Sequence, residues 1–305
     1  LAPCTWDITR LLTSLFLAGD SLSLDSSNEQ RLAQLYLTSY TNILTSGKIR
    51  SIVEDNASGI VVELLTNLDR RSRNELLDER TEIIDDRRQL KFDDKILKIS
   101  REQYQQVDRI IQNWAQTQTQ PDFFEVLDIG FRLAGTGSLG LDRYLILVTG
   151  KGSPNRNYLL DLKQQPTSIL EPYLTEQQPK WTNPATRVMT VQQLVQSAPP
   201  ALLAAIEFNS DSYLLRELQP SQDKIDFKAE QIGLSDLEKL IDTMAEVTAF
   251  AHLHSSGKLG AATAQDLIDY GQNLGWHQEV LSYASNYADR VRLDYQDFYK
   301  ATQDI

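Results

Sequence analysis

The sequence has few of the residues that build covalent or metal-bound cores. Among its 305 residues there are one cysteine, Cys4, and three histidines, His252, His254 and His277. A single cysteine excludes an internal disulfide and a metal cluster built on thiolates. Three histidines are too few for a typical histidine-rich metal site. His252 and His254 are two positions apart on a predicted helix, so they cannot chelate together, and a structural role is favoured for each.

Long apolar runs and an excess of basic residues are also missing. The first apolar stretch, 11–19, is short, is interrupted by Thr13 and Ser14, and has no basic flank or cleavage pattern. It predicts neither a signal peptide nor a membrane span, and we expect a cytoplasmic protein. The 42 acidic residues outnumber the 30 basic ones, giving a net charge of −12. This charge repels nucleic acid and anionic lipid, so neither is expected as a partner, and a polyanion such as ATP needs local cations, amides or a metal.

What remains is an ordinary globular composition, 41% hydrophobic and 24% charged. Apolar residues recur at helical spacing in the first third and the last quarter of the chain. Helices are predicted over residues 8–15, 29–44, 60–68, 101–116, 187–196, 234–255, 261–273 and 276–301. The charge-dense run 69–88 predicts a solvated helix with mixed-sign pairs. Residues 90–99 predict a short hairpin that turns at Asp93 and Asp94.

The polar segment 116–121 ends in Pro121 and is the strongest linker signal in the chain. After it, apolar runs separated by short turns predict an antiparallel sheet. The predicted strands cover residues 123–134, 144–149, 158–163, 202–208 and 212–218. We therefore expect an α+β fold: a helical region 1–120, a sheet lobe 121–220, and a helical region 221–305 that packs with the first.

Gly135-Thr136-Gly137-Ser138-Leu139-Gly140 matches the pattern G-x-G-x-x-G. A strand follows it, which does not fit a dinucleotide-binding fingerprint, since that requires a helix. The kinase type of glycine-rich loop does join two antiparallel strands, and a lysine follows on the third strand, where Lys163 stands. The alternative is a glycine-rich hairpin turn, with Lys163 a strand-end cation that Asp161 on the same face neutralises.

Several further motifs carry a resemblance to a family. They are 126–140, Lys163, Ser168-Ile169-Leu170-Glu171-Pro172-Tyr173, Tyr213-Leu214-Leu215-Arg216-Glu217-Leu218, Ala251-His252-Leu253-His254-Ser255-Ser256-Gly257, Pro3 with Trp6-Asp7 and Arg10-Leu11, and Tyr287-Ala288-Asp289. In this combination the chain resembles, over nearly its whole length, the bacterial family called domain of unknown function 2252.

The resemblance implies a circularly permuted relative of the kinase-like phosphotransferases. It implies a small antiparallel sheet lobe and a helical lobe made by both ends of the chain. A catalytic-loop motif D-x-H-x-x-N and a metal-binding D-x-D segment would precede the Trp6-Asp7 motif. This chain opens on Leu1, just downstream of where both belong, as expected of a fragment or a processed form.

One departure from the family pattern and two open assignments concern single residues. Relatives often carry a glutamate near Thr190, which this chain lacks, and Glu171 is the substitute candidate as partner of Lys163. Asp7 is either a helix N-terminal acid or a hydrogen-bond partner of the catalytic loop. Arg216 is expected to pair with Glu217 or Glu171.

The function implied is ATP-dependent phosphoryl transfer with Mg²⁺, to an acceptor that the sequence does not identify. The amides of Gly135, Gly137 and Gly140, with Thr136 and Ser138 in the same loop, would hold the phosphates, and Lys163 would neutralise them. Catalytic residues are not assigned, because the base and the metal ligands belong upstream. The alternative is a non-catalytic, pseudokinase-like module that binds a nucleotide or a partner, and a weaker one is a structural scaffold.

Overall fold

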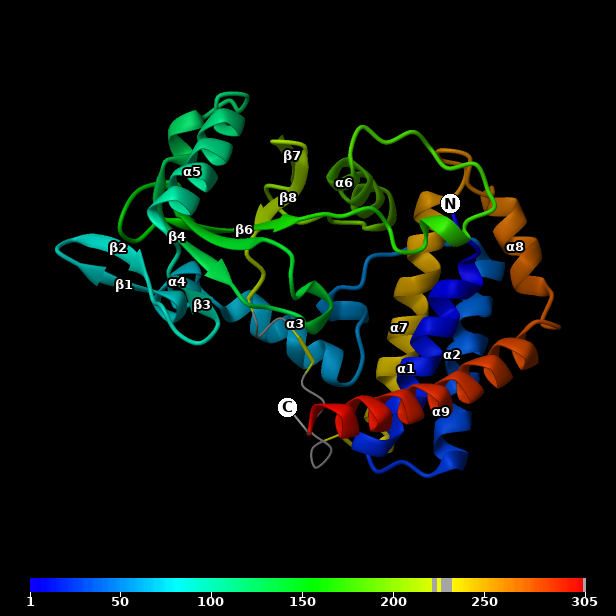
Figure 1. The fold of residues 1–305 in the computed structure, drawn as a ribbon. Helices are drawn as coiled ribbons and strands as arrows, with labels where there is room; N and C mark the ends of the chain where they lie inside the picture. Colours follow the sequence, from blue (N-terminus) through cyan, green and yellow to red (C-terminus); the bar gives the residue numbers. More distant parts are fainter. Residues whose placement is uncertain (221–223, 226–231, 304–305) are drawn as a thin grey trace. The chain divides into compact units, whose positions relative to one another are not determined.

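The computed structural model describes residues 1–220, 224–225 and 232–303 (Figure 1). The chain divides into two compact units. The first is made of Leu1–Asn67, Leu174–Pro179 and Lys224–Ile305, and the second of Leu68–Tyr173 and Lys180–Asp223.

The first unit is helical. Its elements are α1 (Cys4–Ser21), α2 (Ser26–Ser46), the start of α3 (Ile60–Arg70), α7 (Leu234–Ser255), α8 (Ala264–Gln272) and α9 (His277–Thr302). Helix α2 packs along α7 and α8, and α1 packs along α9. Apolar residues from both ends of the chain, among them Leu12, Leu37, Ala245 and Ala284, are buried in one core. The predicted helices of this unit are confirmed, and the N-terminal helices do pack with the C-terminal ones.

Helix α2 shows why these segments begin and end where they do. The Asp25 carboxylate accepts a hydrogen bond from the amide of Asn28 at 2.8 Å, so it satisfies a donor that the first turn leaves free. At the other end, Gly47 takes the left-handed conformation, with φ +61°. Glycine adopts this conformation without a Cβ penalty, and the helix stops there.

The second unit is built on a six-stranded antiparallel sheet of order β3-β4-β5-β6-β8-β7. Its strands are β3 (Ile96–Leu97), β4 (Val126–Arg132), β5 (Arg143–Val148), β6 (Tyr158–Gln164), β7 (Ala204–Phe208) and β8 (Asp211–Glu217). The five predicted strands are confirmed as antiparallel neighbours, and β3 adds an edge strand that pairs with the end of β4. The α+β class is therefore correct.

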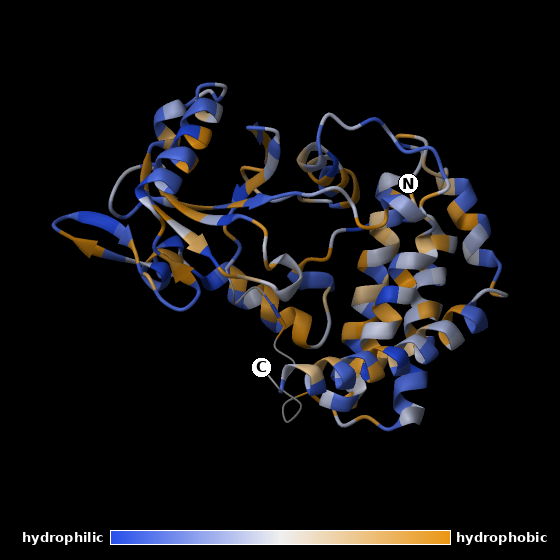
Figure 2. Ribbon diagram, in the orientation of Figure 1, coloured by the Kyte–Doolittle hydropathy of each residue, from blue (hydrophilic) through white to orange (hydrophobic). Residues whose placement is uncertain are grey.

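Both faces of this sheet are covered. On one face, α5 (Arg101–Ala115) buries Ile110 and Ile111 with Ile146 and Leu160 of the sheet. Figure 2 shows the apolar and the hydrophilic sides of α5. Helix α6 (Pro184–Val195) packs on β7 and β8. The boundary expected at residue 120 differs from the observed one at 67/68, because the apolar side of α5 is buried on the sheet and not in the helical core.

On the other face, the alternate residues of the central strands are buried. Leu145, Leu147 and Leu159 pack with Leu77 of α4 (Arg73–Arg80) and with Leu90 of β2 (Arg87–Leu90). Side chains alternate between the faces of a strand, so a run that is apolar throughout, like that of β5, is buried on both sides.

The charged run 69–88 is not one solvated helix, as the sequence predicted. It contains the end of α3, then α4, and then β1 (Thr81–Ile84), which pairs with β2. The β1–β2 hairpin turns at Asp85 and Asp86, which have φ of 49° and 59°. The chain also turns at Asp93, whose amide donates a hydrogen bond to the carbonyl of Ile96 at 3.0 Å. The hairpin predicted over 90–99 is also wrong, because Ile96 and Leu97 pair with β4. Local charge pattern predicted solvent exposure, whereas long-range strand pairing decided the structure.

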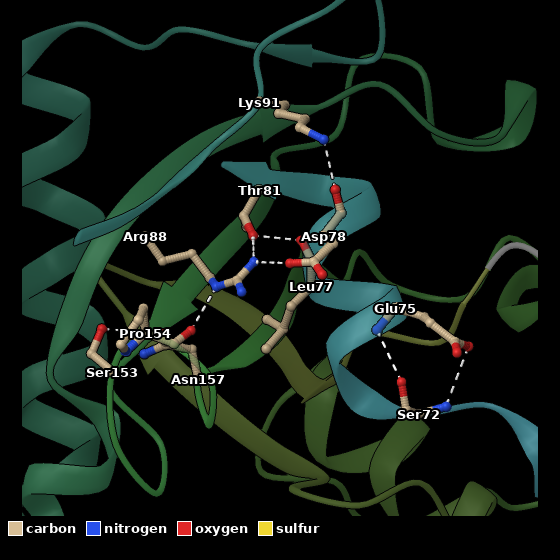
Figure 3. A network of polar contacts seen from close by, with 10 residues as sticks. All are labelled: Ser72, Glu75, Leu77, Asp78, Thr81, Arg88, Lys91, Ser153, Pro154 and Asn157. Carbon is tan, nitrogen blue, oxygen red and sulfur yellow. Dashed lines mark hydrogen bonds and ion pairs between the residues drawn. The ribbon is translucent and has the colours of Figure 1, made fainter. Parts of the chain in front are cut away.

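Arg88 shows how part of this charged run is buried. Its side chain is 2% exposed. It donates hydrogen bonds to the carboxylate of Asp78 at 2.8 Å, to the hydroxyl of Thr81 at 2.7 Å and to the carbonyl of Pro154 at 2.6 Å (Figure 3). A buried charge requires partners of this kind. The guanidinium therefore ties the β1–β2 hairpin to the turn between β5 and β6.

Candidate functional site

The glycine loop joins β4 to β5, which are antiparallel neighbours, as the sequence predicted. A strand follows the loop, and within it only Thr136–Ser138 form a short 3-10 turn. Gly135 and Gly140 have φ of +79° and +85°, a conformation that other residues rarely adopt. A Cβ built on Gly137 or Gly140 would meet no atom within 4 Å. The loop therefore needs glycine at positions 135 and 140 for its backbone conformation. At Gly137 the space in front of the backbone is open.

The loop offers backbone donors. The carbonyl of Gly135 accepts a hydrogen bond from Ser138, and that of Thr136 accepts one from Leu139. The amides of Thr136, Gly137 and Gly140 have no hydrogen-bond partner among the described residues. Thr136 and Gly137 are exposed and Ser138 is half-buried. Such amides, together with a nearby cation, are the groups that bind phosphate oxygens in proteins.

Lys163 lies next to the strand that leaves the loop. Its strand position pairs with Arg143 on β5 and with Leu214 on β8. Burial lowers the pKa of Lys163, and the charges of Arg143 and Arg216 lower it further, while the charge of Asp161 acts in the opposite direction. Its ammonium group makes no ion pair with another of the described residues. Lys163 is therefore a cation close to other cations, and its ammonium N–H groups are available to donate hydrogen bonds to a ligand.

Asp161 does not neutralise Lys163 through an ion pair, because three arginines take its oxygens. Arg143 forms a bidentate ion pair with Asp161, with Nε–Oδ1 and Nη2–Oδ2 distances of 2.7 and 2.6 Å. Arg132 Nη1 donates to Oδ1 at 2.9 Å, and Arg216 Nε lies 3.5 Å from Oδ2. The expected pairing of Arg216 with a glutamate is thus wrong. Strand pairing sets Arg216 opposite Asp161 and leaves the next residue of β8 to pair with Arg73.

The result is a positive patch in an acidic protein. Arg132, Arg143, Arg216 and Lys163 surround one carboxylate and leave a formal local charge of +3. Burial raises the pKa of Asp161, but the hydrogen bond from Arg143 and the three guanidinium charges outweigh it, so that the pKa lies below its ordinary value. The cluster supplies the local cations that an anion needs in a protein whose net charge is −12.

Two members of this cluster, Arg132 and Arg143, were not singled out from the sequence. The signal was present: they are the last residue of one strand and the first of the next, on either side of the glycine loop. Strand alternation places both on the face that carries Asp161 and Lys163. Only the register shows that their side chains meet Asp161, which follows them by 29 and 18 residues.

Glu171 is not brought to Lys163. It begins the short 3-10 turn Glu171–Tyr173 and is exposed, and no ion pair joins it to Lys163 among the described residues. Helix α6, which follows the strand of Lys163 and this turn, contains no acidic residue. A kinase-type lysine–glutamate pair is therefore not formed within the described part of this unit.

The comparison with known proteins agrees with the sequence motifs. Residues 1–301 match the family model described as "Uncharacterized protein conserved in bacteria (DUF2252)". The chain belongs to this family. No match was found among curated proteins or among solved structures. In this DUF2252 protein, none of the described helices is both long enough and apolar enough to span a bilayer.

The helical unit of this DUF2252 protein holds a second polar chain of contacts. Asp7 lies in the first turn of α1, and its Oδ2 is 3.3 Å from Nε2 of His252. The Nδ1 atom of the same ring lies 2.8 Å from the hydroxyl of Tyr40, which is fully buried. Both ring nitrogens of His252 are thus engaged, which supports the structural role predicted for it.

The described residues of the DUF2252 chain do not form a site for a divalent cation from three or more His, Cys, Asp or Glu side chains. In the positive patch, the one buried carboxylate, that of Asp161, already pairs with three arginines. The Asp161 carboxylate is therefore not free to bind a Mg²⁺ ion.

Proposed function

We propose that the sheet unit of this DUF2252 protein is a kinase-like module that binds the phosphates of a nucleotide such as ATP. The observation that carries the proposal is the meeting of two features at one end of the sheet. The glycine loop presents unpartnered amides of Thr136, Gly137 and Gly140, and Lys163 lies on the strand next to the one that leaves the loop. Backbone amides and an ammonium group form charge-assisted hydrogen bonds with phosphate oxygens.

The order of parts supports a kinase-like interpretation. Two antiparallel strands carry the glycine loop between them, the third strand carries the lysine, and a helix follows before the next strand. Protein kinases use the same order to cover and neutralise the phosphates of ATP. Asp161 departs from that pattern, since a protein kinase has alanine at the corresponding position. In this chain three arginines form ion pairs with Asp161.

Two activities are compatible with such a module. The family resemblance favours phosphoryl transfer from ATP to an acceptor. A non-catalytic nucleotide-binding role is favoured by the donor set of the described residues, which lacks a metal site. Binding of the nucleotide is common to both, and it is the step that this chain can be tested for.

The test is calorimetric titration of the intact chain with ATP and ADP, each with and without Mg²⁺. We expect Lys163→Ala to weaken binding by about tenfold to a hundredfold, since a hydrogen bond to a charged group contributes about 1.5–3 kcal/mol. Gly137→Ala places a methyl group in the open space before the loop without a backbone clash, and it should weaken binding while the fold is retained.

Lys151→Ala is the matched control, because Lys151 is an exposed lysine in the turn between β5 and β6, at the other end of these strands. It should bind like the unaltered chain. Absence of binding at millimolar ATP, or equal affinities for the unaltered chain and Lys163→Ala, would contradict the proposal.

A further inference from the structure

A second candidate site lies at the opposite end of β8 from the glycine loop. A cavity of about 550 Å³ is lined there by the junction of α3 and α4, by the segment 196–201 and by the end of β8 with the residues that follow. All of its lining residues belong to the second unit. Small-molecule sites commonly enclose about 300–1,000 Å³, so the cavity has the size of a ligand site.

The lining combines apolar surface with guanidinium groups. Leu76, Pro200 and Leu218 are among its apolar residues. Its charged residues are Arg71, Arg73, Arg216 and Glu217. About half of the lining residues are apolar and half are polar or charged, a composition that suits a ligand with both an apolar body and a charged group.

Arg216 is the group that makes the cavity selective for an anion. Its Nε lies 3.5 Å from Asp161, and its two terminal nitrogens have no hydrogen-bond partner among the described residues. The side chain is 27% exposed. The two terminal nitrogens of a guanidinium lie in one plane, and together they match the two oxygens of a carboxylate.

Arg73 is held in place at the same cavity. It forms an ion pair with Glu217, and its guanidinium carbon lies 3.7 Å from the centre of the Tyr158 ring. Glu217 neutralises Arg73, so an anionic ligand is attracted by the unpaired donors of Arg216 and by the charge of Arg71, which also lines the cavity. The apolar walls then favour a ligand whose body is poorly hydrated.

We propose that this cavity binds a small organic carboxylate with an apolar body, anchored by Arg216. The cavity uses neither the loop amides nor Lys163, although its anchor Arg216 also belongs to the positive patch around Asp161. It therefore does not require that the chain binds a nucleotide.

The experiment uses the full chain with benzoate as the probe and benzamide, its uncharged analogue, as the comparison. Ligand-observed NMR titration of the unaltered chain should show benzoate binding in the millimolar range and much weaker binding of benzamide. Arg216→Gln should weaken benzoate binding by at least about tenfold, while Arg156→Gln, which changes an exposed arginine of the same unit, should leave it unchanged.

Arg216→Gln also removes one partner of Asp161, so a second variant is needed that leaves the Asp161 cluster intact. Ala201 lines the cavity and is not among the residues that pair with Asp161, so Ala201→Trp should fill the space while Arg216 is kept. It should abolish benzoate binding with the fold retained by circular dichroism. The proposal is overturned if benzoate does not bind the unaltered chain, if benzamide binds equally well, or if Ala201→Trp binds benzoate unchanged.

Discussion

Asp161 carries its charge at a position where only 2% of its surface is exposed. Removing a carboxylate from water is costly, and attraction to partners offsets this cost only when the geometry is good. Asp161 has such a geometry. It forms a bidentate ion pair with Arg143 and further contacts with Arg132 and Arg216. The carboxylate in turn allows three guanidinium groups to lie within reach of one another beside the glycine loop.

Asp161→Asn is therefore expected to destabilise the second unit by about 3–5 kcal/mol, because the three arginines lose their common counter-charge. The effect should depend on pH. Since the folded chain lowers the pKa of Asp161 below its ordinary 3.8, this stabilisation is complete above the unfolded pKa and is lost as the pH falls through the folded value. Urea unfolding from pH 7 down to pH 2 measures it.

Asp94→Asn is the control for this series, because Asp94 is exposed and makes no ion pair within the described chain. Its unfolding curves should follow those of the unaltered chain. If Asp161→Asn were as stable as the unaltered chain at neutral pH, the cluster would not stabilise the unit.

Gly140 and Gly137 form a second test at the residue scale. Gly140 has φ +85°, so Gly140→Ala should cost about 1–2 kcal/mol of stability, whatever the free space around it. Gly137 has no such φ and has equally open surroundings, so Gly137→Ala should be close to neutral. Thermal unfolding of the two variants checks this. Equal losses would mean that the loop backbone differs from that described.

At the scale of elements, the β1–β2 hairpin is the part of the sheet unit that depends most on one side chain. Only Thr81, Arg88 and Leu90 of its strands are buried. The three hydrogen bonds of Arg88 reach α4, β1 and the β5–β6 turn. Two strands alone are marginally stable in water, so the hairpin depends on this anchoring and on the packing of Leu90 against the sheet.

Arg88→Met should release the hairpin while most of the sheet stays folded. We expect faster amide hydrogen exchange over 81–90 and a loss of about 3–5 kcal/mol in the stability of that segment, because a buried charge network is broken. Arg87→Met is the matched control: Arg87 is the neighbouring residue on the same strand and is exposed. An equal effect of both substitutions would contradict the anchoring role.

At the scale of the whole molecule, the chain has separate cores. Leu37 is buried in the helical core, and Leu160 is buried on the sheet among the residues that α5 covers. Each unit thus buries its own apolar surface, which is the condition for folding as a unit. The helical unit is built from three stretches of the chain, and its first and last stretches supply the helices that pack together.

Leu160→Ala and Leu37→Ala should therefore each destabilise one unit, by about 2–5 kcal/mol. Hydrogen exchange followed by mass spectrometry should show faster exchange over 68–173 in the first variant, and over 1–67 and 232–303 in the second. Faster exchange throughout the chain in both variants would show that the units unfold together.

The sequence by itself determined most of the elements of this protein. Apolar spacing predicted α7 at 234–255, and alternation and short turns predicted β4 to β8. It also predicted that a strand follows the glycine loop and that Lys163 lies on the next one. These features depend on periodicity and on turn residues, which act over a few neighbouring positions and can be seen in a single chain.

Only the tertiary structure decided which charges meet. Asp161 draws its arginines from β4, β5 and β8, and which of them meet it depends on strand order and register. The burial of Arg88, the assignment of α5 to the sheet and the cavity beside Arg216 have the same origin. A charged residue looks alike in sequence whether it is solvated or buried, because its environment is supplied by segments far away along the chain.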